Sequence, residues 1–348
     1  MQTFALGDRL IGEKQPAFII AEAGINHNGH VERATEMIAA AQQAGADAIK
    51  FQTFTARGLM TRSAGAAVHL QAGAGDEDLY SFVDRLSLSV QDHEGLAGIC
   101  REFSFPFLST AGDPEGVALL ASLGVPAFKV ASMDLDNLPL LTEVARAGKP
   151  VLLSTGMATL AELDTALETI HRAGNDQVIL LHCTSLYPAP PETVNLRAMV
   201  TMRTTFGLPV GYSDHTSGIT VPLAAAALGA CIIEKHFTLD TALPGPDQSF
   251  SADPDELARL VAAIRCVEQA LGSGRKRPAA AEMAMRSAFR RSIVAARDIP
   301  AGAVLNREML AFKRPGSGIS PGDLAWVIGR QTTRPLPEDT VITQRDLV

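Results

Sequence analysis

Eight stretches of the chain share one pattern: a short apolar run, often β-branched, leads into polar residues and then into a segment with helical spacing. Apolar runs of this length predict buried strands, and the segments between them predict amphipathic helices. Several of these segments end in glycine, as helices commonly do. The expected strands lie at residues 18–24, 48–54, 105–112, 127–134, 150–157, 178–185, 209–215 and 231–237.

The alternation of strand and helix predicts an α/β protein built on a (β/α)8 TIM barrel. Eight such units over about 270 residues match the size and order of that fold. A doubly wound open sheet is the alternative, but it usually places a GxGxxG turn after its first strand. Here the first expected strand leads into AEAGINHNG, residues 21–29, which does not have that spacing.

The pattern changes after Gly272. Residues 273–288 are rich in Gly, Ala and basic side chains, which is typical of a connection between domains. Residues 289–348 contain short β-like runs separated by turns. We therefore predict a barrel domain at 1–272, a linker at 273–288 and a small, mostly β domain at 289–348.

Each expected strand carries polar or ionisable residues near its end. A TIM barrel has its active site at the carboxyl ends of its strands, so these side chains predict a functional site there. They are Glu22; Lys50 and Gln52; Ser109; Lys129 and Ser132; Ser154; His182; Ser213 and His215; and Glu234 and His236.

His215 and His236 follow neighbouring strands, so their imidazoles can converge on one ion. Two histidines without a thiolate do not complete a structural zinc site, but with water and substrate oxygens they suit an exchangeable Mn²⁺ or Mg²⁺. A hydrogen-bonded histidine pair is the alternative interpretation.

A second group of residues suits an anion such as a phosphate or carboxylate, because it combines point charges with rotatable donors. The alternatives are that these residues only pair with Glu22, Asp134 and Glu234, or that one lysine forms a Schiff base. The group consists of Lys50, Lys129, Ser132, Ser154 and Ser213.

Composition limits the function classes. A chain that is 47% hydrophobic and 20% charged is expected to fold as an ordinary globular protein. Its net charge of -8 argues against a protein that binds nucleic acids or anionic membranes, because both kinds of protein need a basic surface. With neither a signal-peptide pattern nor an apolar run long enough to span a bilayer, we expect a cytoplasmic protein.

These motifs resemble the sialic acid synthases, which make N-acetylneuraminate and related nonulosonic acids. The resemblance extends over nearly the whole chain, and its last part lies in a small domain similar to type III antifreeze protein, also called the SAF domain. The segments that carry it are AEAGINHNG, IKFQTF, STGM, LLHCTSLYP, GYSDHT, EKHFTLD, GPD and KRPGSGIS.

The resemblance implies a metal-dependent condensation of phosphoenolpyruvate with an N-acylated hexosamine, which releases phosphate. We expect N-acetylmannosamine as the sugar and N-acetylneuraminate as the product. A legionaminate-type synthase that uses a 2,4-diacetamido-trideoxyhexose, a synthase that uses N-acetylmannosamine 6-phosphate, and a non-catalytic sugar-binding barrel are the alternatives.

The resemblance also implies residue roles. His215 and His236 would bind Mn²⁺, with Mg²⁺ or Co²⁺ as alternatives, and Glu22 would act as a catalytic carboxylate. Arg314 would come from the SAF domain of a second copy, which implies a domain-swapped homodimer. Phosphoenolpyruvate would contact Lys50, Lys129, Ser132, Ser154 and Ser213, and the sugar would contact Gln52, Tyr187, Asp247 and Arg314.

The chain departs from the family pattern after the fourth expected strand. The family commonly has SGE there, whereas this chain has SMD, so Met133 replaces a glycine and Asp134 a glutamate. The change adds a side chain and shortens the reach of the carboxylate by one methylene. The departure therefore bears on which N-acylated hexosamine the protein uses.

Overall fold

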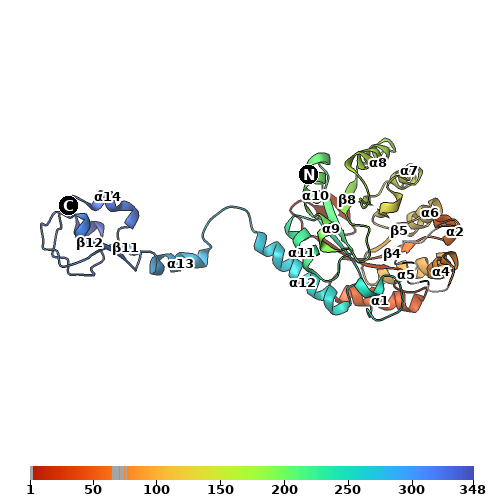
Figure 1. Ribbon diagram of the computed structural model, residues 1–348, viewed down its shortest axis with the longest axis horizontal. Helices are drawn as coiled ribbons and strands as arrows, with labels where there is room; N and C mark the ends of the chain where they lie inside the picture. Colours follow the sequence, from red (N-terminus) through yellow and green to blue (C-terminus); the bar gives the residue numbers. More distant parts are fainter. Residues whose placement is uncertain (1–2, 65–69, 71–73, 75–76) are drawn as a thin grey trace. The chain divides into compact units, whose positions relative to one another are not determined.

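In the computed structural model, which describes residues 3–64, 70, 74 and 77–348, eight parallel strands close into a barrel (Figure 1). The predicted TIM barrel is therefore confirmed. Around the barrel the strands are β3 (Phe18–Gly24), β4 (Ala48–Thr53), β5 (Phe107–Ala111), β6 (Phe128–Val130), β7 (Val151–Ser154), β8 (Val178–His182), β9 (Val210–Asp214) and β10 (Ile232–His236), which pairs with β3.

Helices follow the strands and cover the barrel from outside (Figure 1). Local signals fix their ends: in α6, for example, the Asp113 side chain accepts a hydrogen bond from the Gly116 backbone N–H, and Gly124 ends the helix with a φ of 71°. The helices are α1 (Val31–Gln43), α2 (Ala56–Leu59), α4 (Leu79–Leu86), α5 (Val90–Glu102), α6 (Pro114–Leu123), α7 (Leu138–Arg146), α8 (Leu160–Arg172), α9 (Pro191–Val194), α10 (Arg197–Phe206), α11 (Thr220–Ala227) and α12 (Pro254–Leu271), with the short 3-10 turns η1 (Ser132–Asp134) and η2 (Gln248–Phe250).

Alternate strand residues separate the core into two parts, because successive side chains point to opposite faces of a strand. One set packs between the barrel and the helices, as Ile19, Phe128 and Ile233 do. The other set fills the barrel interior, with Ile20 and Ile232 among its members. Whether a residue faces the helices or the interior therefore depends on its position within the alternation.

An N-terminal hairpin, which the sequence analysis did not predict, packs against the barrel interior. It consists of β1 (Thr3–Leu6) and β2 (Arg9–Gly12), joined by a turn in which Gly7 has a φ of 61°. Phe4, Leu6 and Ile11 belong to the same buried cluster as the interior residues near the start of the strands. The hairpin thus covers the end of the barrel opposite the carboxyl ends of the strands.

The chain divides into two compact units, Met1–Gly272 and Ser273–Val348. The second unit has its own core, which includes Ile293, Leu310 and Leu336. Part of the expected linker is helical, because α13 already begins at Ala280. The elements of this unit are α13 (Ala280–Phe289), β11 (Ser292–Ala295), η3 (Arg307–Met309), β12 (Leu310–Lys313), η4 (Pro321–Asp323), α14 (Leu324–Val327) and η5 (Gln344–Asp346).

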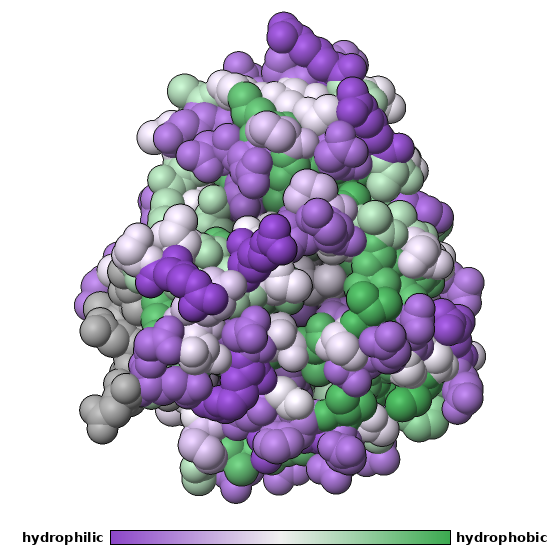
Figure 2. Space-filling view, turned by 90° about the vertical axis from the view of Figure 1, so that its right-hand side faces the viewer, coloured by the Kyte–Doolittle hydropathy of each residue, from purple (hydrophilic) through white to green (hydrophobic). Residues whose placement is uncertain are grey.

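The protein surface in Figure 2 is mainly hydrophilic, with apolar side chains distributed between the polar ones. Within the described residues, no helix is both long enough and apolar enough to cross a bilayer.

Candidate active site at the carboxyl ends of the barrel strands

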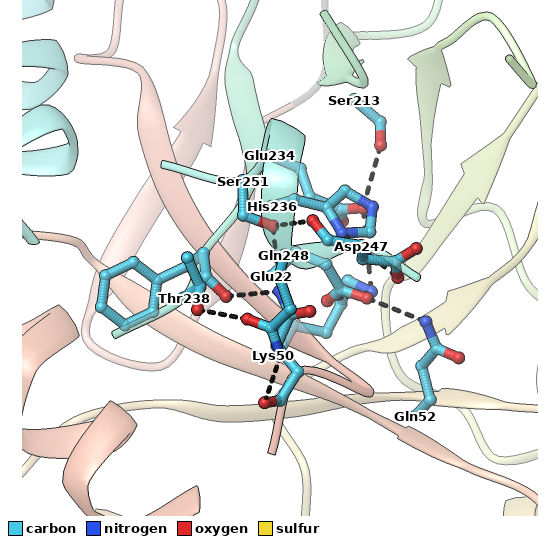
Figure 3. A network of polar contacts seen from close by, with 12 residues as sticks. Glu22, Lys50, Gln52, Ser213, Glu234, His236, Thr238, Asp247, Gln248 and Ser251 are labelled. Carbon is cyan, nitrogen blue, oxygen red and sulfur yellow. Dashed lines mark hydrogen bonds and ion pairs between the residues drawn. The ribbon is translucent and has the colours of Figure 1, made fainter. Parts of the chain in front are cut away.

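The interior of the barrel changes from apolar to ionisable within two residues along several strands. Ile20 is followed by Glu22 on β3, Ala48 by Lys50 on β4, and Ile232 by Glu234 on β10. Six interior side chains at this level are at most 4% exposed, and several of them are drawn in Figure 3. They are Glu22, Lys50, Lys129, Ser154, Ser213 and Glu234.

Two lysines and two carboxylates form the centre of this level. Lys50 Nζ lies 2.6 Å from Glu22 Oε2 and 3.7 Å from Glu234 Oε1, and Lys129 Nζ lies 3.5 Å from the same Glu234 oxygen. Buried charges persist only where opposite charges compensate them, and here the two pairs balance. An incoming anion would therefore meet two ammonium groups that the protein already holds in place.

The pKa values of these groups reflect burial and mutual attraction. Burial raises the pKa of Glu22, and the attraction of Lys50 only partly opposes this effect. Burial opposes the charged form of Lys50, but Glu22 and Glu234 outweigh it and raise the Lys50 pKa. Burial lowers the pKa of Lys129. For Glu234, burial is outweighed by Lys129 and Lys50, which lower its pKa.

The expected serines lie around this centre. Ser213 Oγ donates to Glu234 Oε1 at 2.9 Å, and Ser154 is 3% exposed on the interior face of β7. Ser132 Oγ accepts from the backbone N–H of Gly156 at 3.0 Å and lies 3.0 Å from the sulfur of Cys183. Hydroxyl groups and lysines are thus brought together from β6, β7, β9 and β4.

The two predicted metal ligands are adjacent. The ring centroids of His215 and His236 are 5.4 Å apart, and the Tyr187 ring lies 4.2 Å from that of His215. His215 Nδ1 lies 2.7 Å from the carbonyl oxygen of Thr184. Because a carbonyl can only accept, Nδ1 carries the proton and Nε2 keeps its lone pair for a ligand.

Both imidazoles are neutral near pH 7. Burial lowers the pKa of His215 to about 4 and the pKa of His236 well below its ordinary value. A neutral imidazole is the form that binds a metal ion.

Two buried polar atoms, one on His236 and one on Asp247, are suited to bind a cation. Within the described part of the chain, His236 Nδ1 and Asp247 Oδ1 are buried and lack a hydrogen-bond partner. Asp247 Oδ2 lies 3.7 Å from His236 Nδ1, and burial, followed by the nearby Glu22, raises the pKa of Asp247 to about 7. No group of three His, Cys, Asp or Glu with metal-binding geometry occurs among the described residues, so water and substrate would complete the ligand set.

A buried polar network fixes the loop that carries Asp247 (Figure 3). Asn26 Nδ2 donates to Ser251 Oγ at 2.9 Å, and Ser251 Oγ donates to the Asp247 carbonyl at 2.6 Å. Gln248 Nε2 donates to the Asn26 carbonyl at 2.9 Å, while Gln248 Oε1 accepts from Thr238. These bonds hold Asp247 on the side of the barrel mouth where His236 lies.

A protein-family model described as the NeuB family matches residues 37–276. The chain belongs to the NeuB family. A second model, the SAF domain, matches residues 290–348, so the small second unit of this NeuB protein is the antifreeze-like domain expected from its sequence.

Relatives of the NeuB chain are similar over almost its full length. It is 42% identical over 336 residues to the N,N'-diacetyllegionaminic acid synthase of Legionella pneumophila, covering 95% of this chain and 94% of the relative. It is 35% identical over 338 residues to the N-acetylneuraminate-9-phosphate synthase of Homo sapiens, covering 97% and 94%. The solved structure of N-acetylneuraminic acid (sialic acid) synthetase from Leptospira borgpetersenii superposes with a TM-score of 0.73 at 36% identity, covering 82% of this chain and 95% of that one.

Two strand-end residues expected at the mouth of the NeuB barrel face the helices instead. Ser109 Oγ lies 2.7 Å from the hydroxyl of Thr53, which in turn lies 2.9 Å from a ring nitrogen of His93 on α5. His182 Nε2 donates to the carbonyl of Val194 at 2.6 Å. Both residues occupy outward positions in the strand alternation, so the expectation that they line the mouth was wrong.

The alternation also identifies an interior residue that the sequence analysis missed. Thr110, one position after Ser109, accepts a hydrogen bond from Lys50 Nζ at 3.1 Å. Counting in steps of two from Leu108, which belongs to the interior cluster, would have found it.

The expected sugar contacts are divided between the two units of the NeuB chain. Gln52 Nε2 donates to Glu22 Oε1 at 3.2 Å, so with Tyr187 and Asp247 it lies at the mouth of the barrel. Arg314 belongs to the second unit, where its guanidinium lies 4.8 Å from the centre of the Phe289 ring.

The SMD segment forms the turn η1 after β6. Met133 is 55% exposed. Asp134 Oδ2 is buried and lacks a hydrogen-bond partner among the described residues, and burial raises the pKa of Asp134.

Proposed function

We propose that this NeuB-family protein condenses phosphoenolpyruvate with an N-acylated hexosamine to form a nonulosonic acid and phosphate. One observation carries the proposal: the neutral imidazoles of His215 and His236 lie at the same barrel mouth as a buried pair of lysines. The lysines suit the phosphate and carboxylate of phosphoenolpyruvate, and the imidazoles suit a divalent cation. The family membership supports the same reaction class.

The proposed reaction uses the residues already held in place. Lys50, Lys129 and the three serines bind and orient phosphoenolpyruvate, so that its C3 forms a bond to the aldehyde carbon of the open-chain sugar. A divalent cation held by His215 and His236 would polarise that aldehyde. As C3 adds, the electron pair of the aldehyde C=O bond moves to its oxygen, which takes up a proton and becomes a hydroxyl. Water adds to the C2 cation, and the C–O bond to phosphate then breaks while the new C2 hydroxyl loses its proton and becomes a ketone.

Glu22 is proposed to accept the proton of the attacking water. Its carboxylate is buried and contacts Lys50 Nζ, which holds it close to the anion pocket. Burial raises the pKa of Glu22, which makes the carboxylate a stronger base than an exposed glutamate.

We place a 2,4-diacetamido-trideoxyhexose first among the sugars. The family resemblance led us to expect N-acetylmannosamine, but the chain shares more identity with the Legionella pneumophila N,N'-diacetyllegionaminic acid synthase than with the human N-acetylneuraminate-9-phosphate synthase. N-Acetylmannosamine and its 6-phosphate remain the two comparison substrates, and Mn²⁺ is the proposed ion, with Mg²⁺ or Co²⁺ as alternatives.

A phosphate-release screen over the three sugars tests the proposal. Release is expected only when phosphoenolpyruvate, one of the sugars and Mn²⁺ are all present. His215→Ala and His236→Ala should abolish it, whereas the exposed histidine control His171→Ala should retain it. Full activity after thorough chelation, or binding of sugar without turnover in the presence of metal, would contradict the proposal.

Schiff-base chemistry is the second candidate, and one observation favours it for a single lysine. Burial lowers the pKa of Lys129, as it does in lysines that attack carbonyl groups. Lys50 is unsuited to this role, because its ion pair with Glu22 keeps it protonated. Borohydride treatment with pyruvate would trap an adduct on Lys129 if this chemistry occurs, and no adduct is expected.

We further propose that Arg314 completes the sugar site of a second copy in a domain-swapped homodimer. Opposite charges support association: residues 273–348 have 13 Lys and Arg against 7 Asp and Glu, whereas residues 1–272 have 17 against 31. Mixing inactive Arg314→Ala and His236→Ala proteins should restore activity, because a mixed dimer contains one intact site. A lack of restoration after demonstrated subunit exchange would contradict the swap.

A further inference from the structure

A buried ion pair lies on the side of the barrel wall facing away from the proposed metal site. Lys235 on β10 and Asp214 on β9 are both 0% exposed and stand directly opposite each other in the strand register. Lys235 Nζ lies 2.8 Å from Asp214 Oδ2. Because strand residues alternate, Lys235 points outward while its neighbours Glu234 and His236 point into the barrel.

Burial energy does not explain this pair. The neighbouring outward positions hold Ile233, Phe237 and Tyr212, which pack in the apolar layer between barrel and helices. Apolar residues at 214 and 235 would continue that layer, and they commonly stabilise a protein as well as a buried ion pair does. What the pair provides instead is a fixed geometry, because each of its polar atoms needs a directed partner.

The pair holds the backbone on both sides of His215. Asp214 Oδ1 accepts hydrogen bonds from the backbone N–H of Thr216 at 3.0 Å and from its hydroxyl at 2.8 Å. Lys235 Nζ donates to the backbone carbonyl of Thr216. His215 therefore lies between Asp214 and a residue whose N–H and C=O are both bound to the pair.

The same pair also fixes the strand that carries the other histidine. Lys235 immediately precedes His236, so its contacts with Asp214 and Thr216 link the backbones on which the two imidazoles are mounted. Tyr212 OH donates a further hydrogen bond to Asp214 Oδ1 at 2.9 Å, which fixes the carboxylate from the β9 side.

We propose that Asp214 and Lys235 are positioning residues for the divalent-cation site. They set the spacing of the His215 and His236 imidazoles from the opposite face of the strands, without contacting cation or substrate. The proposal rests on the proposed function, because it takes these two histidines as the metal ligands. Groups that orient metal-bound histidines commonly change metal affinity tenfold or more when they are replaced.

The test measures Mn²⁺ binding directly, from the electron paramagnetic resonance signal of the free ion, with no substrate present. The main variant is the double replacement Asp214→Leu with Lys235→Met, which leaves no unpaired buried charge. We expect its dissociation constant for Mn²⁺ to rise about tenfold or more. Its dissociation constant for phosphoenolpyruvate should stay within about twofold of the unmodified protein, because the lysines of the anion pocket stand on β4 and β6, whereas the pair binds residues of β9 and of the turn after it.

A milder variant keeps the test decisive if the double variant does not fold. Thr216→Val removes one hydroxyl that donates to Asp214 and preserves side-chain shape, and a weakening of Mn²⁺ binding of about threefold is expected from loss of that one bond. Ile170→Ala on α8 is the matched control, since it removes core packing from a helix that follows β7, a strand that pairs with neither β9 nor β10, and it should leave Mn²⁺ affinity unchanged.

The outcomes separate the two proposals. The metal site stands if the unmodified protein binds Mn²⁺ and the variant with both His215→Ala and His236→Ala does not. In that case the positioning role is overturned if the folded Asp214 and Lys235 double variant binds Mn²⁺ as tightly as the unmodified protein. Where the double variant does not fold, unchanged Mn²⁺ binding by Thr216→Val overturns it. If the unmodified protein does not bind Mn²⁺, or the variant without the two histidines binds it equally well, the metal site and the positioning role are both overturned.

Discussion

Replacing His27 is predicted to remove part of the acid sensitivity of the barrel. His27 follows β3, is 1% exposed, and its Nδ1 accepts a hydrogen bond from the Gly29 backbone N–H at 3.0 Å. The ring is therefore neutral in the folded protein, with its proton on Nε2. Burial lowers the pKa of His27 to about 4.

The sign of the effect follows from proton binding in the two states. In the unfolded chain His27 binds a proton near pH 6.5, whereas in the folded protein it does so only near pH 4. Its contribution to stability is therefore present above pH 6.5 and is lost as the pH falls toward 4. The difference between the two pKa values corresponds to about 3 kcal/mol of the free energy of unfolding. About 2 kcal/mol of this contribution is lost between pH 7.5 and pH 5.

Urea unfolding followed by far-ultraviolet circular dichroism measures this contribution in the unmodified protein and in His27→Asn. Asparagine can accept the Gly29 N–H but does not titrate. The unmodified protein should lose about 2 kcal/mol more than the variant between pH 7.5 and pH 5. The only tryptophan, Trp326, lies in the second unit, which contains no histidine, so its fluorescence gives an internal control. Equal losses in both proteins would refute the reasoning.

Three further predictions concern the barrel and its anion pocket. Gly211→Ala should lower the free energy of unfolding by about 1–3 kcal/mol in urea titrations, because a Cβ there would lie 2.7 to 2.8 Å from neighbouring barrel atoms. Lys129→Met should raise the KM for phosphoenolpyruvate about tenfold or more, because Glu234 would keep its negative charge while the pocket loses one ammonium group; an unchanged KM would exclude Lys129 from the pocket. Gly156→Ala should also raise this KM, because its Cβ would lie 2.9 Å from the Ser132 hydroxyl and closer still to that of Ser185, and would displace both. Ser132→Ala should have a smaller effect on this KM, because it removes one of these hydroxyls and leaves the other in place.

The barrel could be predicted from the sequence because its strands and helices each carry a local signal. The N-terminal hairpin carried one too: short apolar runs lie on either side of Gly7 and Asp8, a turn sequence typical of hairpins. Its two strands have only four residues each, so their signal is much weaker than that of the barrel strands. The loop that presents Asp247 has no periodic pattern, and only the family resemblance indicated it.

Predicting the site required the direction of each side chain as well as its distance from the strand end. Strand-end position alone placed Ser109 and His182 at the mouth, yet both point toward the helices, and it overlooked Thr110. The interior apolar cluster resolves this ambiguity, because residues an even number of positions from Ile20, Leu108 or Ile232 on the same strand share its face.

The same alternation explains why three ionisable residues can follow one another at the end of β10. Glu234 and His236 face the barrel mouth, where one contacts the lysine pair and the other contacts His215. Lys235 faces the helices and binds Asp214 on the neighbouring strand. A buried charge that points inward needs a partner inside the barrel, and one that points outward needs a partner in the apolar layer. The end of β10 can therefore carry all three ionisable residues only because β9 places the Asp214 carboxylate opposite Lys235. Moving that carboxylate by one position along β9 would leave Lys235 buried without its partner and would turn the carboxylate toward the anion pocket.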